Sequence, residues 1–225
     1  MAEMHDTTEE YLETILEIEE EGVTPIRARL VERLGLSAAA VSETVNRLVD
    51  AGYAQLLDDR SLLLTTKGRD LATTVVRRHR LAERLLTDVI GLEWEKVHRE
   101  ADRWEHAISS DVEEKLVLLL GDPLTCPHGN PIPGSRRGGE IIVGVSLRKS
   151  PAGPITVVRV SEKLEMSDVH LGLLSRARLI PGCAGEILRT QPDGVVVATP
   201  AGEYTIPFEA AEQVYVTPAP VGVPA

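Results

Sequence analysis

Apolar residues recur at helical spacing in three successive stretches of the first 52 residues. The first stretch, 6–22, begins with an Asp-Thr-Thr sequence that can cap a helix and ends at Gly22. The second opens at Pro25 and stops at Gly35, and Ser37 can cap the third, which ends at Gly52. The pattern therefore predicts three helices, the last two joined by a short turn.

Two short β-rich runs follow the third predicted helix. Tyr53–Leu57 and Ser61–Thr65 flank an Asp-Asp-Arg turn, which is the arrangement of a β-hairpin. A hairpin that directly follows a helix-turn-helix forms a wing. Residues 1–70 are therefore predicted to be a winged helix-turn-helix DNA-binding domain.

Helical spacing continues to residue 121 and then stops. Helices predicted over 66–90, 92–108 and 109–121 make 71–140 a helical domain, whose last part from about 121 is a Pro- and Gly-rich linker. Five short β-rich runs then predict a small barrel over 141–217, followed by a disordered tail over 218–225. The predicted fold class is mainly α with a small β domain.

Composition narrows the functional classes. The 225 residues are 43% hydrophobic and 26% charged, as in soluble globular proteins. No apolar run approaches the ~20 residues of a membrane helix, and the acidic start lacks signal-peptide features, so we expect a cytoplasmic protein. The net charge of −11 argues against nonspecific binding to nucleic acid or membranes, although a local basic face is compatible with it. Cys126 and Cys183 form no CxxC motif, so neither a disulfide framework nor a thiolate zinc site is indicated.

The third predicted helix carries side chains suited to DNA. A helix-turn-helix lays its second helix in the major groove, where short polar side chains reach base edges and basic residues meet phosphates. The alternative is a packed helix with a solvated polar face, which the agreement of cap, turn, spacing and wing disfavours. The candidate DNA-contacting residues are Arg27, Ser37, Ala39, Ser42, Glu43, Asn46, Arg47 and Arg60, with Arg29 and Lys67 as further phosphate contacts.

Metal-ligand residue types recur at helical spacing in the middle domain. One pair, His79 and Glu83, lies at i and i+4. A second set of two imidazoles and two carboxylates shares one helix face, and metal binding competes evenly with a solvated or ion-paired face. His5 and His128 are expected to be surface and linker residues. The second set is His98, Asp102, Glu105 and His106.

At these motifs the sequence resembles the diphtheria toxin repressor and iron-dependent regulator family of bacterial metal-sensing repressors. The match spans nearly the whole chain and rests on DTTEEYLETILEIEEEGVTPIRARLVERL, DRSLLLTTKGRDLA, HRLAERLLTDVIGLEWEKVHREADRWEHAIS and GNPIPG. The resemblance implies a homodimer whose middle domain dimerises and binds divalent metal, and an SH3-like third domain. It implies a double-stranded DNA operator that holds one or two dimers, with no membrane and no small organic substrate as partner.

The same resemblance implies two metal sites. In the second site, the family completes the ligand set with a Glu and a Gln from the SH3-like domain. In this sequence Ser167 and His170 stand at those two places. Glu165 or Asp168 would therefore have to supply the carboxylate. The first site corresponds to Glu10, Asp102, Glu105 and His106. The second corresponds to His79, Glu83 and His98, completed by His170 with Glu165 or Asp168.

The first site differs from that of the iron-sensing branch, in which Met and Cys take the places of Glu10 and Asp102. Mn(II) is a hard ion that prefers oxygen, whereas sulfur ligands suit later transition metals. The sequence therefore predicts Mn(II), with Fe(II), Co(II) or another divalent metal as the alternative. A local alternative for Glu10 is a capping box, because Thr7-x-x-Glu10 matches that motif at a helix start.

These elements predict a manganese-dependent repressor of metal-uptake and homeostasis genes, and not an enzyme. Metal would tie the start of the first helix to the middle domain and so fix the two recognition helices of a dimer for DNA. An iron(II)-dependent repressor of the same family is the main alternative. A metallohydrolase is the distant one, because no further acid or base signature accompanies the metal-ligand residues.

Overall fold

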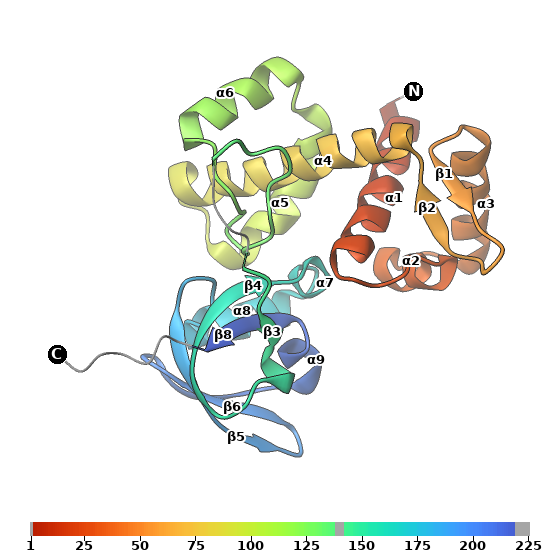
Figure 1. Ribbon diagram of the computed structural model, residues 1–225. Helices are drawn as coiled ribbons and strands as arrows, with labels where there is room; N and C mark the ends of the chain where they lie inside the picture. Colours follow the sequence, from red (N-terminus) through yellow and green to blue (C-terminus); the bar gives the residue numbers. More distant parts are fainter. Residues whose placement is uncertain (1, 138–141, 219–225) are drawn as a thin grey trace. The chain divides into compact units, whose positions relative to one another are not determined.

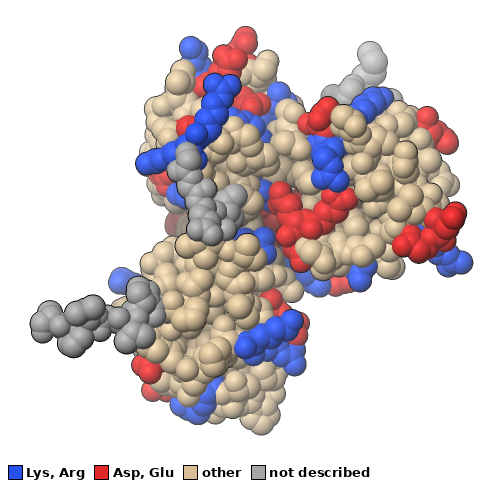
Figure 2. All heavy atoms as spheres, viewed as in Figure 1, with Lys and Arg blue, Asp and Glu red and all other residues tan. Residues whose placement is uncertain are grey.

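The computed structural model describes residues 2–137 and 142–218 (Figure 1). It divides into two compact units, one of Met1–His79 with Asp102–Glu113, the other of Arg80–Ala101 with Glu114–Ala225. Within the described residues, no helix combines the length and the apolar character needed to cross a membrane. In the view of Figure 2, Lys and Arg side chains form small separate groups on the surface rather than one continuous patch.

The first unit contains the predicted winged helix-turn-helix. Gly35 adopts the left-handed conformation, with φ of 65°, and ends the second helix. The Ser37 hydroxyl accepts a hydrogen bond of 3.2 Å from the Ala40 amide and caps the third. The elements are α1 (Ala2–Glu20), α2 (Arg27–Leu34), α3 (Ala38–Asp50), β1 (Ala54–Leu56), β2 (Leu62–Leu64) and α4 (Thr66–Arg84), with β1 and β2 antiparallel.

The start of the first helix differs from the prediction. Residues 2–10 are already helical, so the expected caps at Asp6, Thr7 and Thr8 lie inside α1. A capping box requires its Thr at the helix start, which excludes that interpretation for Glu10. The side chain of Glu10 is therefore available for another role.

The apolar faces of these elements form one core. It includes Leu12 and Ile15 from α1 and Val41 and Val45 from α3, none of which is exposed to solvent. Packing of α1 against the helix-turn-helix fixes the polar face of α1 as well as its apolar face.

The middle helices are shorter than predicted. After α4 the chain makes a π-helical turn, Leu85–Ile90, which ends at Gly91 with φ of 78°. The single helix expected over 92–108 is divided into the 3-10 turn Trp94–Lys96, α5 (Val97–Trp104) and the 3-10 turn Glu105–Ala107, and α6 (Ser110–Leu120) follows. The tighter turn places Glu105 and His106 at a different angle from an ideal helix.

The segment predicted to be a linker is packed into the second unit. Its residues Cys126, His128, Asn130 and Ile132 are buried, and an isolated bridge joins Thr125 to Pro131. His128, predicted to be a linker residue rather than a ligand, is therefore buried inside this loop. Pro and Gly here shape a tight loop instead of a spacer, and local composition cannot distinguish the two.

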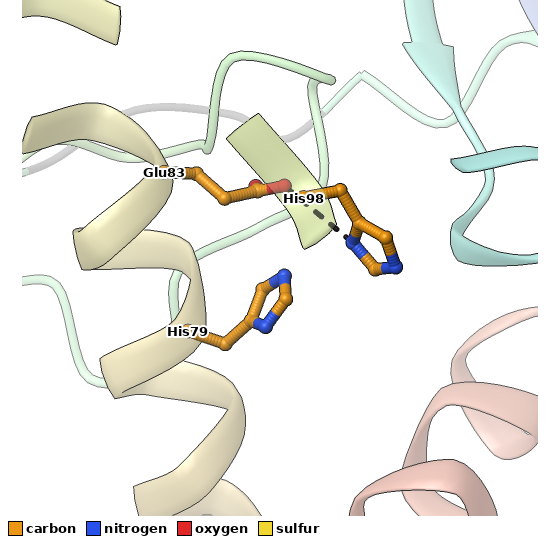
Figure 3. Close-up of side chains that lie close together, drawn as sticks. All are labelled: His79, Glu83 and His98. Carbon is orange, nitrogen blue, oxygen red and sulfur yellow. Dashed lines mark ion pairs between the residues drawn. The ribbon is translucent and has the colours of Figure 1, made fainter. Parts of the chain in front are cut away.

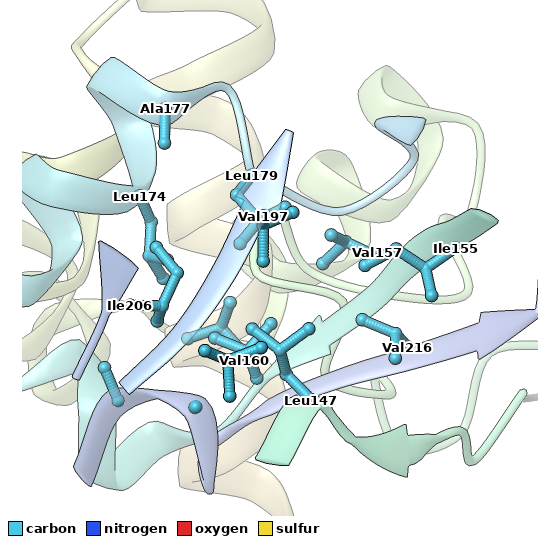
Figure 4. Close-up of a cluster of buried hydrophobic side chains, with 14 of the residues drawn as sticks. Leu147, Ile155, Val157, Val160, Leu174, Ala177, Leu179, Val197, Ile206 and Val216 are labelled. Carbon is cyan, nitrogen blue, oxygen red and sulfur yellow. The ribbon is translucent and has the colours of Figure 1, made fainter. Parts of the chain in front are cut away.

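The remaining residues form the SH3-like domain. Its antiparallel sheet has the order β3-β8-β4-β5-β6-β7, and its buried side chains surround Leu147, Val157 and Val197 (Figure 4). The strands are β3 (Val145–Ser146), β4 (Gly153–Val160), β5 (Ala184–Gln191), β6 (Gly194–Thr199), β7 (Gly202–Ile206) and β8 (Val214–Pro218). The sequence pattern did not predict the helices α7 (Glu162–Glu165), α8 (Asp168–Ala177) and α9 (Phe208–Ala211). Pro218 ends β8, and the rest of the predicted tail lies outside the described residues.

Candidate functional site

The predicted DNA-reading residues lie on the surface of the first unit. Ser37, Ala39, Glu43 and Asn46 are exposed along α3 and its cap, whereas Ser42 is half-buried. The large apolar side chains of α3 are absent from this face, because Val41, Val45 and Leu48 are buried in the core.

Basic residues surround that face. Arg27 donates a hydrogen bond of 2.7 Å to the Asn46 side-chain oxygen, which joins the start of α2 to α3. Arg47 is exposed on α3, and Arg60 is exposed in the hairpin turn with φ of 68°. A polar helix face with basic groups at its sides is the arrangement that a recognition helix requires.

One cluster of metal-ligand residues lies within the first unit, and we call it the first centre. His79 Nδ1 lies 2.6 Å from Glu105 Oε2 and 3.4 Å from Asp102 Oδ1. His106 Nε2 lies 3.3 Å from Glu105 Oε1. His79 and Glu105 are buried, whereas the Asp102 side chain is 51% exposed. The first centre consists of Glu10, Glu13, His79, Asp102, Glu105 and His106.

Glu13 is a member that the sequence interpretation missed. It is only 8% exposed, and a ligand oxygen of Glu13 lies within 4.8 Å of those of His79 and Glu105. Burial raises the pKa of Glu13 well above its ordinary value, and the carboxylates of Glu105 and Glu17 raise it further. The sequence signal that could have indicated this role is the position of Glu13. It lies one helical turn after Glu10, on a face of the helix that otherwise buries apolar residues.

Glu10 stands at the exposed edge of the same cluster. Partial burial raises the pKa of Glu10; His106 lowers it, and Glu105 and Asp102 raise it again. The neighbouring Glu9, also missed, places Oε2 2.7 Å from His106 Nδ1. These charges show that the start of α1 faces the residues of α5 and the following turn.

A second cluster lies entirely within the second unit, and we call it the second centre. Glu83 Oε1 lies 3.7 Å from His98 Nδ1, the ion pair drawn in Figure 3, and His79 stands one turn before Glu83 on α4. Glu165 Oε2 lies 3.2 Å from the same His98 nitrogen. The second centre consists of Glu83, His98, Cys126, His128, Glu162 and Glu165.

The packed loop contributes two of these residues, neither of which was predicted as a ligand. His128 is fully buried, with Nδ1 3.0 Å from Glu83 Oε1 and 2.9 Å from Glu165 Oε2. Burial lowers the pKa of His128, but the Glu165 and Glu83 carboxylates outweigh it and raise the pKa well above the usual value. The Cys126 thiol offers a ligand atom within 4.8 Å of those of Glu83 and His128.

The local backbone explains how the loop places them. Gly129 has φ of 88°, and a Cβ there would lie 2.2 Å from the Val158 carbonyl oxygen, so only glycine fits. The Val160 amide donates a hydrogen bond of 2.8 Å to the His128 carbonyl oxygen. The ring of Trp94 packs on that of His128 with a centroid separation of 4.6 Å. Strand β4 and Trp94 together hold His128 in one position.

The structure separates the SH3-like residues predicted for this site. Glu165 joins the second centre, and Asn130 donates a hydrogen bond of 2.7 Å to its Oε1. Asp168 is exposed and pairs with Arg99, and His170 Nε2 lies 3.0 Å from Glu209 Oε1. Glu162, which the sequence interpretation missed, places Oε2 3.8 Å from His98 Nδ1.

Both donor sets fit a divalent cation. The first centre offers oxygen and imidazole nitrogen, and the second adds one thiol. In the second centre Glu83, Glu162 and Glu165 are buried together, an arrangement that is costly without a compensating charge. Moreover, the buried Nε2 of His128 has no hydrogen-bond partner among the described residues. A divalent ion would compensate the carboxylates in place of the positive charge that a protonated His128 supplies.

Two family models match the chain. Residues 3–62 match the iron dependent repressor N-terminal DNA binding domain, and residues 65–134 match the iron dependent repressor metal binding and dimerisation domain. The first match includes the whole helix-turn-helix and the second includes α4 to the packed loop.

Curated relatives match along most of the chain. The iron-dependent repressor IdeR of Mycobacterium tuberculosis is 46% identical over 227 residues, which cover 96% of this chain and 99% of that protein. The diphtheria toxin repressor of Corynebacterium diphtheriae is 58% identical over 134 residues, or 60% of this chain and 59% of that protein.

Solved structures are similar too. A manganese-dependent transcriptional repressor in complex with manganese is 28% identical, with a TM-score of 0.81 over 94% of this chain and 99% of that one. The IdeR of T. acidophilum is also 28% identical, with a TM-score of 0.74 over 93% of this chain and 96% of that one.

Proposed function

Because the chain belongs to the iron-dependent repressor family, we propose that it is the manganese-dependent form of such a repressor and controls metal-uptake and homeostasis genes. The family consists of metal-dependent DNA-binding transcriptional repressors, not enzymes, and its members bind a DNA operator as homodimers. Manganese as the activating metal and the cytoplasm as the place of action are parts of the proposal.

The donor set of the first centre is the observation that carries the choice of manganese. Its members supply carboxylate oxygens and imidazole nitrogens, and no sulfur ligand. Mn(II) prefers such hard donors and competes poorly for sulfur sites in the Irving–Williams order. Glu10 and Asp102 stand at the two positions for which the resemblance implies Met and Cys in iron-sensing members.

The first centre joins the start of α1 to the segment 102–106. When bound, the divalent ion supplies positive charge that offsets the crowded carboxylates. Glu10 and Glu13 of α1 would bind this ion from one side. Asp102, Glu105 and His106 would bind it from the other, and α1 would then be connected through it to the segment 102–106. Restricting α1 also restricts the helix-turn-helix that packs on it, which raises operator affinity by preorganisation, typically by about 1–3 kcal/mol of coupling.

Operator reading is assigned to α3 and the wing. Ser37, Ser42, Glu43 and Asn46 face the bases, and Arg27, Arg47 and Arg60 contact phosphates, with Ala39 close to the groove wall. One operator can hold one or two dimers. The second centre binds a metal ion through Glu83, His98, Cys126, His128 and the carboxylates of α7, whereas His170 and Asp168 are occupied by other partners.

Iron(II) is the second candidate activator. The observation in its favour is that the curated relatives at 46% identity carry the name iron-dependent repressor. Co(II) or other divalent metals are expected to substitute in vitro.

The test is operator binding, followed by fluorescence anisotropy, against buffered free Mn(II) or Fe(II) without oxygen. Wild type should respond to Mn(II), and the double variant Glu10→Met with Asp102→Cys should shift its response toward Fe(II), Co(II) or Ni(II). Each single variant should shift less. An unchanged order of metals across these four proteins would refute the role of the first centre in selectivity, and equal operator binding after chelation would refute metal dependence.

A further inference from the structure

Arg80 is the largest fully buried side chain of the described residues, at 1% exposure. It lies on α4 three residues before Glu83, in the second unit. A buried guanidinium keeps its charge at all physiological pH values, so its environment has to compensate that charge.

The contacts of Arg80 lead to the second centre. Its Nε and Nη2 donate to the same oxygen of Glu162, Oε1, at 3.1 and 2.9 Å. Its Nη1 donates a hydrogen bond of 2.5 Å to the Pro131 carbonyl oxygen in the packed loop. Arg80 thus holds α7 and the loop that carries Cys126 and His128.

The two oxygens of Glu162 have different surroundings. Oε1 is held by Arg80, whereas Oε2 lies 3.8 Å from His98 Nδ1, next to Glu165. Two donors of the rigid guanidinium meet at one oxygen and fix the position of Oε1, which a single flexible ammonium does less well. Arg80 therefore sets which oxygen of Glu162 faces the other members of the centre.

The cost of this arrangement is an argument for a functional role. A buried ion pair is often no more stabilising than apolar side chains of similar volume. The pair also lies beside Glu83 and Glu165, where Arg80, together with His128, offsets part of the negative charge of three buried carboxylates.

We propose that Arg80 is a positioning residue of the second centre, which orients Glu162 through Oε1 so that Oε2 is presented as a ligand oxygen. This inference rests on the metal binding proposed for the second centre. Partners of ligand residues typically change metal affinity by about 10–100-fold when they are removed, and Arg80 should act within that range.

The experiment uses Co(II) as a spectroscopic probe of the full-length protein without oxygen. A thiolate-to-cobalt charge-transfer band reports on the second centre, because the first centre contains no cysteine, and its absence in Cys126→Ser assigns the band. Arg80→Met should lower the Co(II) affinity read from this band about 10–100-fold and change the d–d spectrum. Arg80→Lys, which keeps the charge but loses the fork, should restore the affinity only in part.

The control is Arg148→Met, which removes an exposed arginine–glutamate pair, Arg148 with Glu212, in the same unit. It should leave the band and the affinity unchanged. If Arg80→Met fails to fold in metal-free thermal unfolding, Arg80→Lys decides alone. Its weaker Co(II) binding with an intact fold supports the proposal, and wild-type binding overturns it.

Two other results would also overturn the proposal. One is a wild-type spectrum and affinity in folded Arg80→Met. The other is the lack of any thiolate band in wild type, because Cys126 then does not ligate the ion and the donor set on which the proposal rests is wrong. Neither affects Mn(II)-dependent operator binding, which tests the proposed repressor function separately through the first centre.

Discussion

Replacing Glu13 by Gln should have opposite effects on the metal-free and metal-bound protein. An ionised Glu13 faces an ionised Glu105 with ligand oxygens within 4.8 Å. At this upper limit of separation and an effective dielectric constant of about 20, the two charges repel by about 3.5 kcal/mol, and more at a shorter distance. Protonation of Glu13 relieves part of this repulsion, so Glu13→Gln should stabilise the metal-free protein by about 1–3 kcal/mol. The same change removes a charged ligand and should weaken Mn(II) binding at least about tenfold.

The assay combines urea unfolding in the presence of a chelator with Mn(II) titration of the folded protein. Glu20→Gln is the matched control, because it removes an exposed carboxylate from the same helix and should change neither quantity. The reasoning fails if Glu13→Gln destabilises the metal-free protein, or if it binds Mn(II) as tightly as wild type does.

The pH dependence of stability has a defined sign. The folded-state pKa of Glu13 is raised from the ordinary 4.5, so the protonated group stabilises the fold fully below that value. This contribution is lost as the pH rises through the raised pKa. Metal-free wild type should therefore lose stability relative to Glu13→Gln as the pH rises from 4.5 through the raised pKa, and a stability difference that does not change with pH would contradict the assignment.

Three further changes test other parts of the molecule. Glu43→Gln should alter the operator selected from a random DNA pool, because a carboxylate only accepts hydrogen bonds and favours a cytosine amino group; identical selected motifs would show that Glu43 does not reach the bases. Cys126→Ser should weaken Zn(II) or Co(II) binding at the second centre by about tenfold or more and Mn(II) binding less, measured by chelator competition. Gly129→Ala should cost more than about 1 kcal/mol of unfolding free energy, because its φ of 88° and the Val158 carbonyl exclude a Cβ; an unchanged denaturation midpoint would refute the tight-loop argument.

The winged helix-turn-helix was predictable because its signals are local. Gly35 ends α2, Ser37 caps α3, and the hairpin follows at once, so each element is specified by its own residues. The start of α1 was not predictable in this way. Asp6–Thr8 can cap a helix, but they do not act as caps when the residues before them belong to the same helix. Cap residues show where a helix can begin, and the preceding residues decide whether it does.

The metal centres were only partly predictable, for a reason of distance along the chain. Residues that share one helix face, such as Asp102 and Glu105, can be recognised from spacing alone. The spacing of Glu13 from Glu10 places both on one helix face, but it does not reveal the cluster, because His79 is 66 residues away in sequence and reaches Glu13 only through the fold. Cys126 and His128 lie in a Pro- and Gly-rich stretch whose composition is the same for an exposed linker and for a buried loop.

The two centres differ in the kind of metal that their donors favour, and this difference bears on regulation. The thiol of Cys126 gives the second centre affinity for later transition metals, which bind more tightly than Mn(II) at almost any site. If the first centre had the same donors, such metals would displace manganese from it as well. Oxygen donors at Glu10, Glu13 and Asp102 reduce that advantage, so the site that restrains α1 can respond to manganese while the thiol-containing site is filled by another ion. In the proposed function, selectivity of the repressor then depends on which centre is coupled to α1, and the described carboxylates Glu9, Glu10 and Glu13 of α1 lie at the first centre.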